Sequence, residues 1–483
     1  MSKNHYDKYE TVVGLEVHVQ LATQSKAFCA DDASFGGEPN THISVISLGH
    51  PGTLPRLNKK QFEFAIRLGL ALESRISPVS YFDRKNYFYA DLPKGYQITQ
   101  DRLPVCVGGH IDVRVGEAER RIRIHHIHME EDAGKSIHDQ DETNSLIDLN
   151  RAGVPLLEIV TEPDFRSAEE VDVFMNNMRR LVRYLEISDG NMEQGSMRCD
   201  CNVSVRLKGE ETFGERCEIK NMNSMRFARR AINFEFSRQV DLIESGGKVQ
   251  QQTLNFDPVT GTTSPLRDKE DAHDYRYFPE PDLPPFVASE AIIEGIKAEM
   301  PTLPEQHFVH FTETMGITAY DAGILVEEKS VALFFLELCK HTKNTKGAAN
   351  LIINRINPIC KDMEIDIEAF PVSLTGLAEL IELIDTDKIS NAMAYQRLLP
   401  EMLEKPGNTP LDLANQLGLI QTSDEGFIEK IVDEVILAFP DKVTAYQSGK
   451  KGLLGFFMGE VMKRSQGKAE PKSTNALLLE KLG

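Results

Sequence analysis

The clearest pattern in the chain is an alternation of apolar and polar residues near the N-terminus. In VVGLEVHVQL, apolar side chains recur at every second position, at Val13, Leu15, Val17, Val19 and Leu21. Because successive side chains of a strand point to opposite faces, this pattern predicts a half-buried β-strand. Glu16 and His18 would share its polar face, either as solvated surface residues or as part of a site.

Two later segments repeat the alternation. In SMRCDCNVSVRL, one predicted face is apolar and carries Cys199, Cys201, Val203, Val205 and Leu207. The other face carries Arg198, Asp200, Asn202, Ser204 and Arg206. RCEIKNMNS follows, where Glu218 and Lys220 alternate with apolar residues and precede Asn221. We interpret the Cys-x-Cys pair as core, because without a second pair it is weak evidence for zinc.

The periodicity changes after the proline-rich stretch FPEPDLPPF, which leaves little room for regular structure. From Ala288 to about Leu403, apolar residues recur at spacings of three and four, which predicts successive amphipathic helices. KPGNTP, at 405–410, interrupts this pattern before a last helical segment. We therefore predict an α+β fold with three domains: a mixed or antiparallel-sheet domain over 1–290, a helical domain over 291–405, and a small helical tail over 406–483.

Composition narrows the class of protein. A chain of 483 residues is long enough for several domains, and no stretch of about twenty apolar residues predicts a membrane span. The polar N-terminus and seven cysteines, an odd number, favour a reduced, cytoplasmic protein without a disulfide framework. The net charge of −20 argues against a protein that coats nucleic acid, but a local basic patch remains open.

Two acidic segments suggest metal chemistry. Glu158 stands alone in the apolar segment GVPLLEIVTEPD, where a carboxylate is costly unless it is paired or binds a cation. HHIHMEEDAGKS gathers three histidines with Glu130, Glu131 and Asp132 before a Gly-Lys-Ser. Its spacing matches neither a standard zinc motif nor a P-loop, while clustered carboxylates beside a lysine suit Mg²⁺ and phosphate.

Cations and aromatic residues gather in FDRKNYFYADLPKGYQITQ. Lys85, Asn86, Tyr89 and Lys94 surround its Pro-Lys-Gly turn. Such a segment can stack a base and hold phosphates, or it can be a packed aromatic turn. Together, the acids, the histidine and the cations of these strands fit phosphoryl transfer, without naming a substrate.

The same stretches resemble the B subunit of the bacterial Asp/Glu-tRNA amidotransferase family, in that family's order and over essentially the whole chain. They are GLEVHVQL, LGHPGTLPRLN, FDRKNYFYADLPKGYQITQ, HMEEDAGKS, DLNRAGVPLLEIVTEPD, EQGSMRCDCNVSVR, EIKNMNSMR and DYRYFPEPDLPP. The segment GKKGLLGFFMGEVMKRSQGKAEPKSTNALLLEKL resembles the family's C-terminal tRNA-binding tail.

This resemblance implies an ATP-dependent ligase. Residues 1–290 would be a cradle domain that phosphorylates the side-chain carboxylate of Glu-tRNA(Gln) or Asp-tRNA(Asn), after which ammonia displaces the phosphate. The ammonia would come through a tunnel from a partner amidase, the A subunit, and a small C subunit would complete a heterotrimer.

The resemblance also assigns residues. It places the Mg²⁺ ligands at Glu16, His18, Glu130 and Glu158. It places Lys85 and Lys94 at tunnel or phosphate-facing positions. Asn86, Tyr89, Arg198, Asp200, Asn202, Lys220 and Asn221 are further candidates for nucleotide or acceptor-end contacts, with structural roles as the alternative.

A departure from the family concerns zinc. Some members carry a Cys-x-Cys followed by a Cys-x-x-Cys near the start. Here the first pair is Cys29 and Asp31, and the second is Ser44 and Ser47. One thiolate cannot hold a structural zinc ion, so we expect none.

The tail reverses the acidic charge of the chain. From Asp441 onward, eight lysine and arginine residues face four acidic ones, a net charge of +4. Lys450, Lys451, Lys463 and Arg464 are the candidate tRNA contacts. Gly452, Gly455 and Gly459 would lie along one side of a helix, which permits a close backbone approach by RNA or by a neighbouring helix.

Two alternatives remain. A non-catalytic tRNA-binding scaffold would need none of the four acidic and histidine candidates, so their joint presence argues against it. The archaeal E subunit shares the front domain but carries a large inserted domain, for which this chain has no room.

Overall fold

The computed structural model describes residues 5–137, 140–141, 143–222, 224–266, 275–421, 425–465 and 467–483, without the side chains of Asn221 and Glu425. The chain divides into two compact units, residues 1–304 and 305–483, and each is described by itself. The first is built on β-sheets and the second on helices, which confirms the predicted α+β fold. The division into three domains at the predicted residues stays a prediction.

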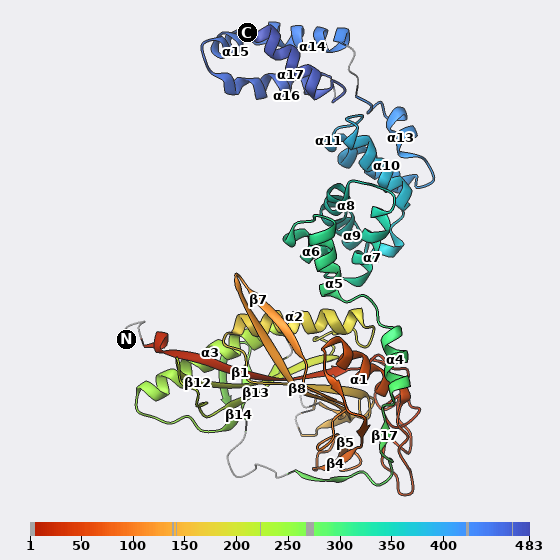
Figure 1. Ribbon diagram of the computed structural model, residues 1–483, viewed down its shortest axis with the longest axis vertical. Coiled ribbons are helices and arrows are strands. Elements are labelled where there is room, and N and C mark those ends of the chain that lie inside the picture. Colours follow the sequence, from red (N-terminus) through yellow and green to blue (C-terminus); the bar gives the residue numbers. More distant parts are fainter. Residues whose placement is uncertain are drawn as a thin grey trace. The chain divides into compact units, whose positions relative to one another are not determined.

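Among the described residues of the first unit, ten strands form one large sheet in the order β15-β14-β13-β12-β1-β11-β8-β6-β2, with β7 paired to β8 (Figure 1). All neighbouring pairs are antiparallel except β13 and β14. The strands are β1 (Tyr9–Gln20), β2 (Arg75–Ile76), β6 (Cys106–Val107), β7 (His110–Val115), β8 (Ala118–Glu131), β11 (Pro155–Thr161), β12 (Met197–Leu207), β13 (Cys217–Met222), β14 (Gln252–Asp257) and β15 (Thr262–Pro265).

The predicted alternation in β1 and β12 is confirmed. The apolar residues of β1 from Val13 to Val19 are at most 1% exposed, and Cys199, Cys201 and Val203 of β12 are equally buried. Leu207 differs, because β12 ends there and leaves its side chain 39% exposed. The apolar face belongs to the same core as residues of α2 (Ala168–Tyr184) and α3 (Met225–Glu244).

Local sequence explains where these two helices begin. The Ser167 and Ser224 hydroxyls accept hydrogen bonds from backbone N–H groups in the first turns of α2 and α3. Such caps satisfy donors that have no partner inside the helix. With one face of the sheet packed in this way, the polar side chains of β1 and β12 are left on the other face.

Smaller elements complete the first unit. A three-stranded sheet contains β16 (Arg276–Pro279), β4 (Asp83–Asn86) and β5 (Tyr96–Thr99) in that order. The proline-rich stretch, where we expected little regular structure, thus overlaps two short strands: β16, which ends at Pro279, and β17, which begins at Phe286. Among the described residues of this unit, the further elements are the strand pairs β9 (Lys135–Ile137) with β10 (Leu146–Asp148) and β3 (Val79–Ser80) with β17 (Phe286–Val287), the helices α1 (Lys59–Ala71) and α4 (Glu290–Ala298), and the 3₁₀ turn η1 (Tyr6–Lys8).

The second unit is helical over its described residues, as predicted. Its helices are α5 (Pro304–Val309), α6 (Ala319–Leu325), α7 (Lys329–Cys339), α8 (Thr345–Leu351), α9 (Asn357–Met363), α10 (Leu374–Asp385), α11 (Asn391–Met393), α12 (Leu399–Glu404), α13 (Pro410–Gln416), α14 (Glu425–Ala438), α15 (Pro440–Gln447), α16 (Leu454–Arg464) and α17 (Pro471–Leu482). Three segments are π-helical, at η3 (His310–Thr314), η4 (Ile352–Ile356) and η6 (Ala394–Leu398), and two are 3₁₀ turns, at η5 (Ile367–Ala369) and η7 (Lys451–Leu453).

The last four helices share a core of their own, which includes Ile428, Val432, Val435, Tyr446, Phe457, Val461, Leu478 and Leu482. Gly455 and Gly459 lie on α16, whereas Gly452 lies in η7 before it. Only two of the three glycines that we predicted to share one helix therefore lie on α16. None of the described helices is both long and apolar enough to cross a membrane.

Candidate functional site

The candidate site is built around β1, which lies between β11 and β12. In this register His18 is opposite Glu158 of β11, and Glu16 is opposite Asp200 of β12. Glu158 is in turn opposite His128 of β8. Antiparallel pairing therefore brings polar residues from distant parts of the sequence side by side on one face of the sheet.

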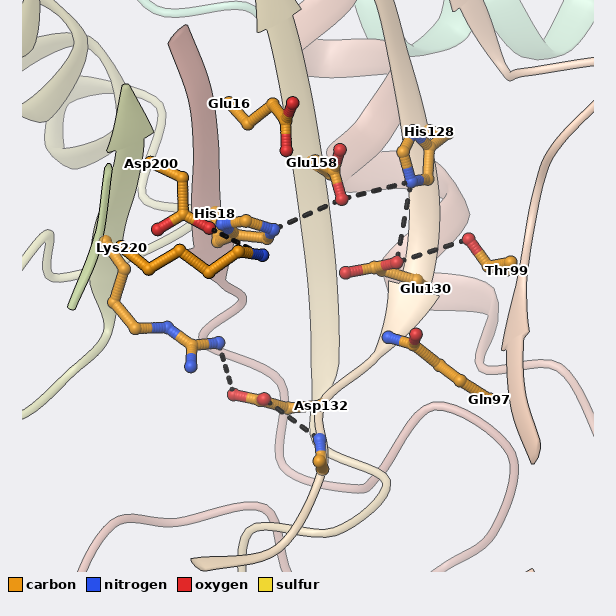
Figure 2. A network of polar contacts seen from close by, with 12 residues as sticks. Glu16, His18, Gln97, Thr99, His128, Glu130, Asp132, Glu158, Asp200 and Lys220 are labelled. Carbon is orange, nitrogen blue, oxygen red and sulfur yellow. Dashed lines mark hydrogen bonds and ion pairs between the residues drawn. The ribbon is translucent and has the colours of Figure 1, made fainter. Parts of the chain in front are cut away.

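The first group of ligand atoms contains His18, Glu130 and Glu158. One ligand atom from each lies within 4.8 Å of the others. His18 Nε2 is 3.1 Å from Glu158 Oε2, and His128 Nε2 is 3.5 Å from both Glu130 Oε2 and Glu158 Oε2. Figure 2 shows these side chains converging from three neighbouring strands. Two carboxylates and a neutral imidazole at this spacing can hold a divalent cation, whose binding would displace the proton that His18 otherwise carries.

Close contact between acids and imidazoles shifts their pKa values. Burial disfavours the charged form of His18, but the hydrogen bond and charge of Glu158, with the charge of Glu130, raise its pKa to about 9. Burial likewise opposes ionisation of Glu158, yet His128, His18 and Lys85 hold the pKa of that carboxyl well below its usual range. The positive groups around Glu158 thus keep this carboxyl ionised.

A second group lies beside the first and contains Glu16, Asp200 and Glu218, again with ligand atoms within 4.8 Å. Asn202 Nδ2 donates to Glu16 Oε1 at 3.1 Å, and Lys220 Nζ lies 3.0 Å from Glu218 and 3.6 Å from Asp200. Burial, followed for Glu16 by the charge of Glu158, raises the pKa values of Glu16 and Asp200. Three carboxylates this close repel one another, so a cation would stabilise them.

The geometry divides the four predicted metal ligands. Three of them form the first group, and Glu16 belongs to the second group with Asp200 and Glu218. Of the residues predicted as nucleotide or acceptor-end contacts, Asp200 is itself a member of this second group, and Asn202 and Lys220 contact it. Their assignment to either metal or nucleotide stays a prediction.

Lys85 and Lys94 occupy different surroundings. Lys85 lies 4.7 Å above the Tyr275 ring, and although burial opposes its charge, Glu130 and Glu158 raise its pKa. Lys94 forms an ion pair with Glu131, which is 4% exposed. Lys94 and Glu131 line a cavity of about 190 Å³, whereas Lys85 is not part of its wall.

The other predicted contacts have mixed placements. Arg198 donates to Asp132 at 2.9 Å, and Gln20 donates to the same carboxylate oxygen at 2.6 Å, so this arginine is held inside a buried network. Asn86 donates to the backbone carbonyls of Arg84 and Arg276, which is a structural role. Tyr89 is 40% exposed and contacts the Tyr87 ring. The Asn221 side chain lies outside the described part of the structure.

The positions that correspond to a zinc knuckle form a hydrogen-bonded cluster. Ser47 Oγ donates to Asp31 Oδ2 at 2.6 Å, and the Ser44 backbone N–H donates to Ser47 Oγ at 2.9 Å. Burial opposes ionisation of Asp31, but hydrogen bonds from Ser47, Ser44 and Cys29 outweigh it and lower its pKa. In a zinc knuckle, thiolates at these four positions would be held together by the metal. Here hydrogen bonds connect Asp31, Ser44 and Ser47 instead.

The tail cations differ in their contacts. Lys450 and Lys463 are exposed. Lys451 Nζ donates to the Gly483 carbonyl at 3.0 Å and lies 4.1 Å above the Tyr446 ring. Arg464 contacts the Glu434 carbonyl at 3.4 Å.

Sequence reasoning missed two members of the site. His128 bridges Glu130 and Glu158, and its place in HHIHMEEDAGKS, two residues before Glu130, was the available signal. Glu218 completes the second group, and its alternation with Lys220 placed both on one strand face.

Comparison with known proteins gives matches along nearly the whole chain. The family model described as the GatB/GatE catalytic domain matches residues 11–294, and the model described as the GatB domain matches residues 333–482. The B subunit of the aspartyl/glutamyl-tRNA(Asn/Gln) amidotransferase of Anaeromyxobacter sp. (strain Fw109-5) is 48% identical over 479 residues, which are 98% of this chain and 99% of that protein. Proteins of the same description from Myxococcus xanthus and Trichlorobacter lovleyi are 48% and 49% identical, each over 98% of this chain and 99% of its own length.

Proposed function

Since the chain belongs to the family of aspartyl/glutamyl-tRNA(Asn/Gln) amidotransferase B subunits, we propose that it amidates misacylated tRNA at the site on β1, β8 and β11. The side-chain carboxylate of Glu-tRNA(Gln) or Asp-tRNA(Asn) attacks the γ-phosphorus of ATP, which forms an acyl phosphate and ADP. Ammonia then displaces phosphate from the acyl carbon and leaves the amide. The reaction takes place in the cytoplasm, where aminoacyl-tRNA is used.

One observation carries this proposal, namely the convergence of His18, Glu130 and Glu158 from three neighbouring strands to within 4.8 Å. The donor set fits Mg²⁺, which prefers carboxylate oxygens, and the group of Glu16, Asp200 and Glu218 offers a place for a second ion. Mg²⁺ held by these residues would neutralise charge on phosphate oxygens and on the attacking carboxylate. A non-catalytic scaffold has no use for acids gathered at such spacing, since their mutual repulsion has to be offset by positive groups.

Lys85 supplies a fixed positive charge beside this group. Its ammonium is largely buried, and the charges of Glu130 and Glu158 raise its pKa, so it stays protonated at neutral pH. A cation placed there can clamp a transferring phosphoryl group at little cost of reorganisation. We assign Lys85 this role.

Lys94 suits the delivery of ammonia. With Glu131 it lines a cavity of about 190 Å³, whose lining also includes Ile46, Ser47 and His50. Ammonia released by a partner amidase, the A subunit, would enter the first unit there and pass the Lys94–Glu131 pair. A small C subunit completes the proposed heterotrimer.

The exposed cations of the tail support tRNA binding. Lys450 and Lys463 are free to approach phosphates, and the Cβ positions of Gly455 and Gly459 have no described heavy atom within 4 Å. A phosphate backbone can therefore come close to this side of α16. Contacts of this kind recognise the shape of a tRNA rather than its base sequence.

A second basic surface lies in the same unit and was not predicted. Between Glu337 and Asp362 the sequence has five lysine and arginine residues and no acidic residue. Lys343, Lys346 and Lys361 are exposed along the run of α8, η4 and α9, and none forms an ion pair within the described part of the chain. A local excess of this kind suits RNA phosphates even in an acidic protein.

The test of the proposed function combines the chain with the A and C subunits, Glu-tRNA(Gln), Mg²⁺, ammonium and labelled ATP. Phosphate release and Gln-tRNA formation are followed together for the wild type, for Glu130→Gln and for Glu119→Gln, a matched change on the exposed end of β8. Both products should form with the wild type and Glu119→Gln and disappear with Glu130→Gln. Normal tRNA binding without ATP consumption by the wild type would make the chain a scaffold.

A further inference from the structure

The end of β8 that carries Glu130 has no strand neighbour on one side. On that side, β6 pairs with β8 at His126 and Ile127, while β8 continues to Glu131. Among the described strands, none continues this ladder beside Met129, Glu130 and Glu131. Backbone groups there need other partners, because an unpaired buried N–H or carbonyl is costly.

Side chains of the sequence Gln97-Ile98-Thr99-Gln100 take the place of the missing strand. Gln100 Oε1 accepts the Met129 N–H at 3.0 Å, and Gln97 Nε2 donates to the Glu131 carbonyl at 2.7 Å. Gln100 is 2% exposed and Gln97 is 7% exposed. The backbone of β8 is therefore fixed on both sides of Glu130.

Thr99 acts on the Glu130 carboxylate itself. Its Oγ1 donates to Glu130 Oε2 at 3.2 Å, and the same oxygen lies 3.5 Å from His128 Nε2 (Figure 2). Thr99 is 3% exposed, so water does not compete for this hydroxyl. Its hydrogen bond selects one orientation of a carboxylate whose neighbours, His18 and Glu158, offer the other ligand atoms.

We propose that Thr99 and Gln97 are positioning residues, which hold the Glu130 carboxylate where it and Glu158 can bind a divalent cation together. This inference rests on the cation site of the proposed function. Hydrogen bonds to a carboxylate ligand fix its geometry before the cation arrives, and their loss typically lowers metal affinity by about 10–100-fold.

The alternative is that these side chains only stabilise the sheet. Under either role, removing one of these buried hydrogen bonds lowers the stability of the fold, so thermal unfolding alone does not separate the two roles. Cation affinity does, because removing a remote, partly buried hydrogen bond destabilises the sheet without changing the orientation of Glu130. Thr263 provides that comparison, since its Oγ1 donates to Glu235 Oε2 at 3.0 Å on β15, an outer strand of the same sheet.

The experiment measures Mn²⁺ binding to the full-length chain by electron paramagnetic resonance of free Mn²⁺, with thermal unfolding of each variant in parallel. Thr99→Val removes the hydroxyl at nearly constant volume, Thr99→Ser keeps it, and Gln97→Leu removes the donor to Glu131. Glu130→Gln gives the effect of losing the ligand itself, and Thr263→Val is the control. We expect Thr99→Val and Gln97→Leu to weaken binding at one class of site by about tenfold or more. Thr99→Ser and Thr263→Val should bind like the wild type.

The possible results separate these roles. Wild-type affinity in folded Thr99→Val and Gln97→Leu overturns the inference, as does an equal loss of affinity in Thr263→Val. If either Thr99→Val or Gln97→Leu does not fold, the comparison of the other variant with Thr263→Val decides the question. A Thr99→Ser variant that binds Mn²⁺ as weakly as Glu130→Gln also overturns the proposal. A wild-type chain that binds no Mn²⁺ refutes the cation site of the proposed function, which is a different failure.

Discussion

Glu158 lies in an otherwise apolar strand and accepts contacts from two imidazoles, His18 at 3.1 Å and His128 at 3.5 Å. Its neighbours Leu157 and Ile159 are fully buried. In such surroundings a lone carboxylate would take up a proton, yet the positive groups around Glu158 lower its pKa. The strand therefore presents to the site an acid that is ionised at neutral pH.

Replacing this charge tests the site at the residue scale. Glu158→Gln should reduce ATP-dependent amidation at least about 100-fold, even when ammonium replaces glutamine, because an electrostatic contact to the reacting groups is removed. The variant keeps the size of the side chain, so its unfolding temperature should fall little. Coupled assays of ATP consumption and amide formation give the result, and activity near that of the wild type would exclude Glu158 from the chemistry.

Thiols give a second prediction for single residues. Burial raises the pKa of Cys29 to about 11, although a backbone hydrogen bond at Asp31 opposes the shift, and burial raises the pKa of Cys339 to about 11. Because the thiolate is the nucleophile, its fraction falls about tenfold for each pH unit below the pKa. In the native chain at pH 8, alkylation of both residues by iodoacetamide should be at least about 100-fold slower than in denaturant. The rate should rise steadily toward pH 10.

Peptide mass spectrometry after timed labelling measures this directly. Cys106 is the control, since it is completely buried and should not react at any pH at which the chain stays folded. Rapid alkylation of native Cys339 at pH 7 would contradict its position in the fold.

At the scale of elements, the sequence predicted which segments form strands better than it predicted which strands pair with one another. The alternation in β1 and β12 identified both strands and the face each would bury, because burial of one face leaves a period of two. It did not show that β1 would pair with β11 and β12, since register depends on contacts across the sheet. For this reason Glu16 was grouped with His18 on its own strand, whereas pairing places it beside Asp200 and Glu218.

Nothing in the sequence indicated that the side chains of Gln97 and Gln100 would take the place of a strand beside β8. A glutamine in YQITQ gives no indication of whether it will bond to water or to the backbone of β8. Polar residues at alternate positions are commonly solvated, and only the packing of β5 against β8 shows that these are buried.

The basic surface of α8 and α9 leads to a prediction for tRNA. Lys343→Ala with Lys346→Ala should weaken tRNA binding and reduce the slope of log affinity against log salt concentration by about two, because each lysine at a phosphate releases about one counterion. Lys59→Ala with Lys60→Ala is the matched control, since both lysines are exposed and already paired with Glu63. Filter binding between about 50 and 200 mM salt measures the slope. An unchanged slope would leave this surface without a role in RNA binding.

At the scale of the whole molecule, the chain separates a sheet unit that carries the candidate chemistry from a helical unit that carries the basic surfaces. The change from alternation to helical periodicity predicted this division. Where the tail begins was harder to place, because α13 lies within the predicted tail yet contacts α10 and α12. Leu413 of α13 is 1% exposed, so a cut before it would open a packed core.

Truncation after Gln421 tests the tail without that damage. The shortened chain, in complex with the A and C subunits, should bind tRNA at least about tenfold more weakly, because the exposed cations Lys450 and Lys463 are lost. Amidation at saturating tRNA should be retained, since the candidate site lies in the first unit. An unchanged affinity would reduce α14–α17 to a packing element.

The position of β1 at the centre of the sheet has a consequence for protein synthesis. Its partners appear late, since Glu158 follows His18 by 140 residues and Asn202 follows Glu16 by 186. At about 5–20 residues per second, a ribosome needs roughly seven to thirty seconds to add the first of these partners. During that time the apolar face and both edges of β1 have no sheet to join. We predict that nascent chains stalled at residue 140 bind chaperones and are rapidly cut near β1 by protease, whereas chains released at full length resist, and early resistance would mean that β1 is protected before its sheet exists.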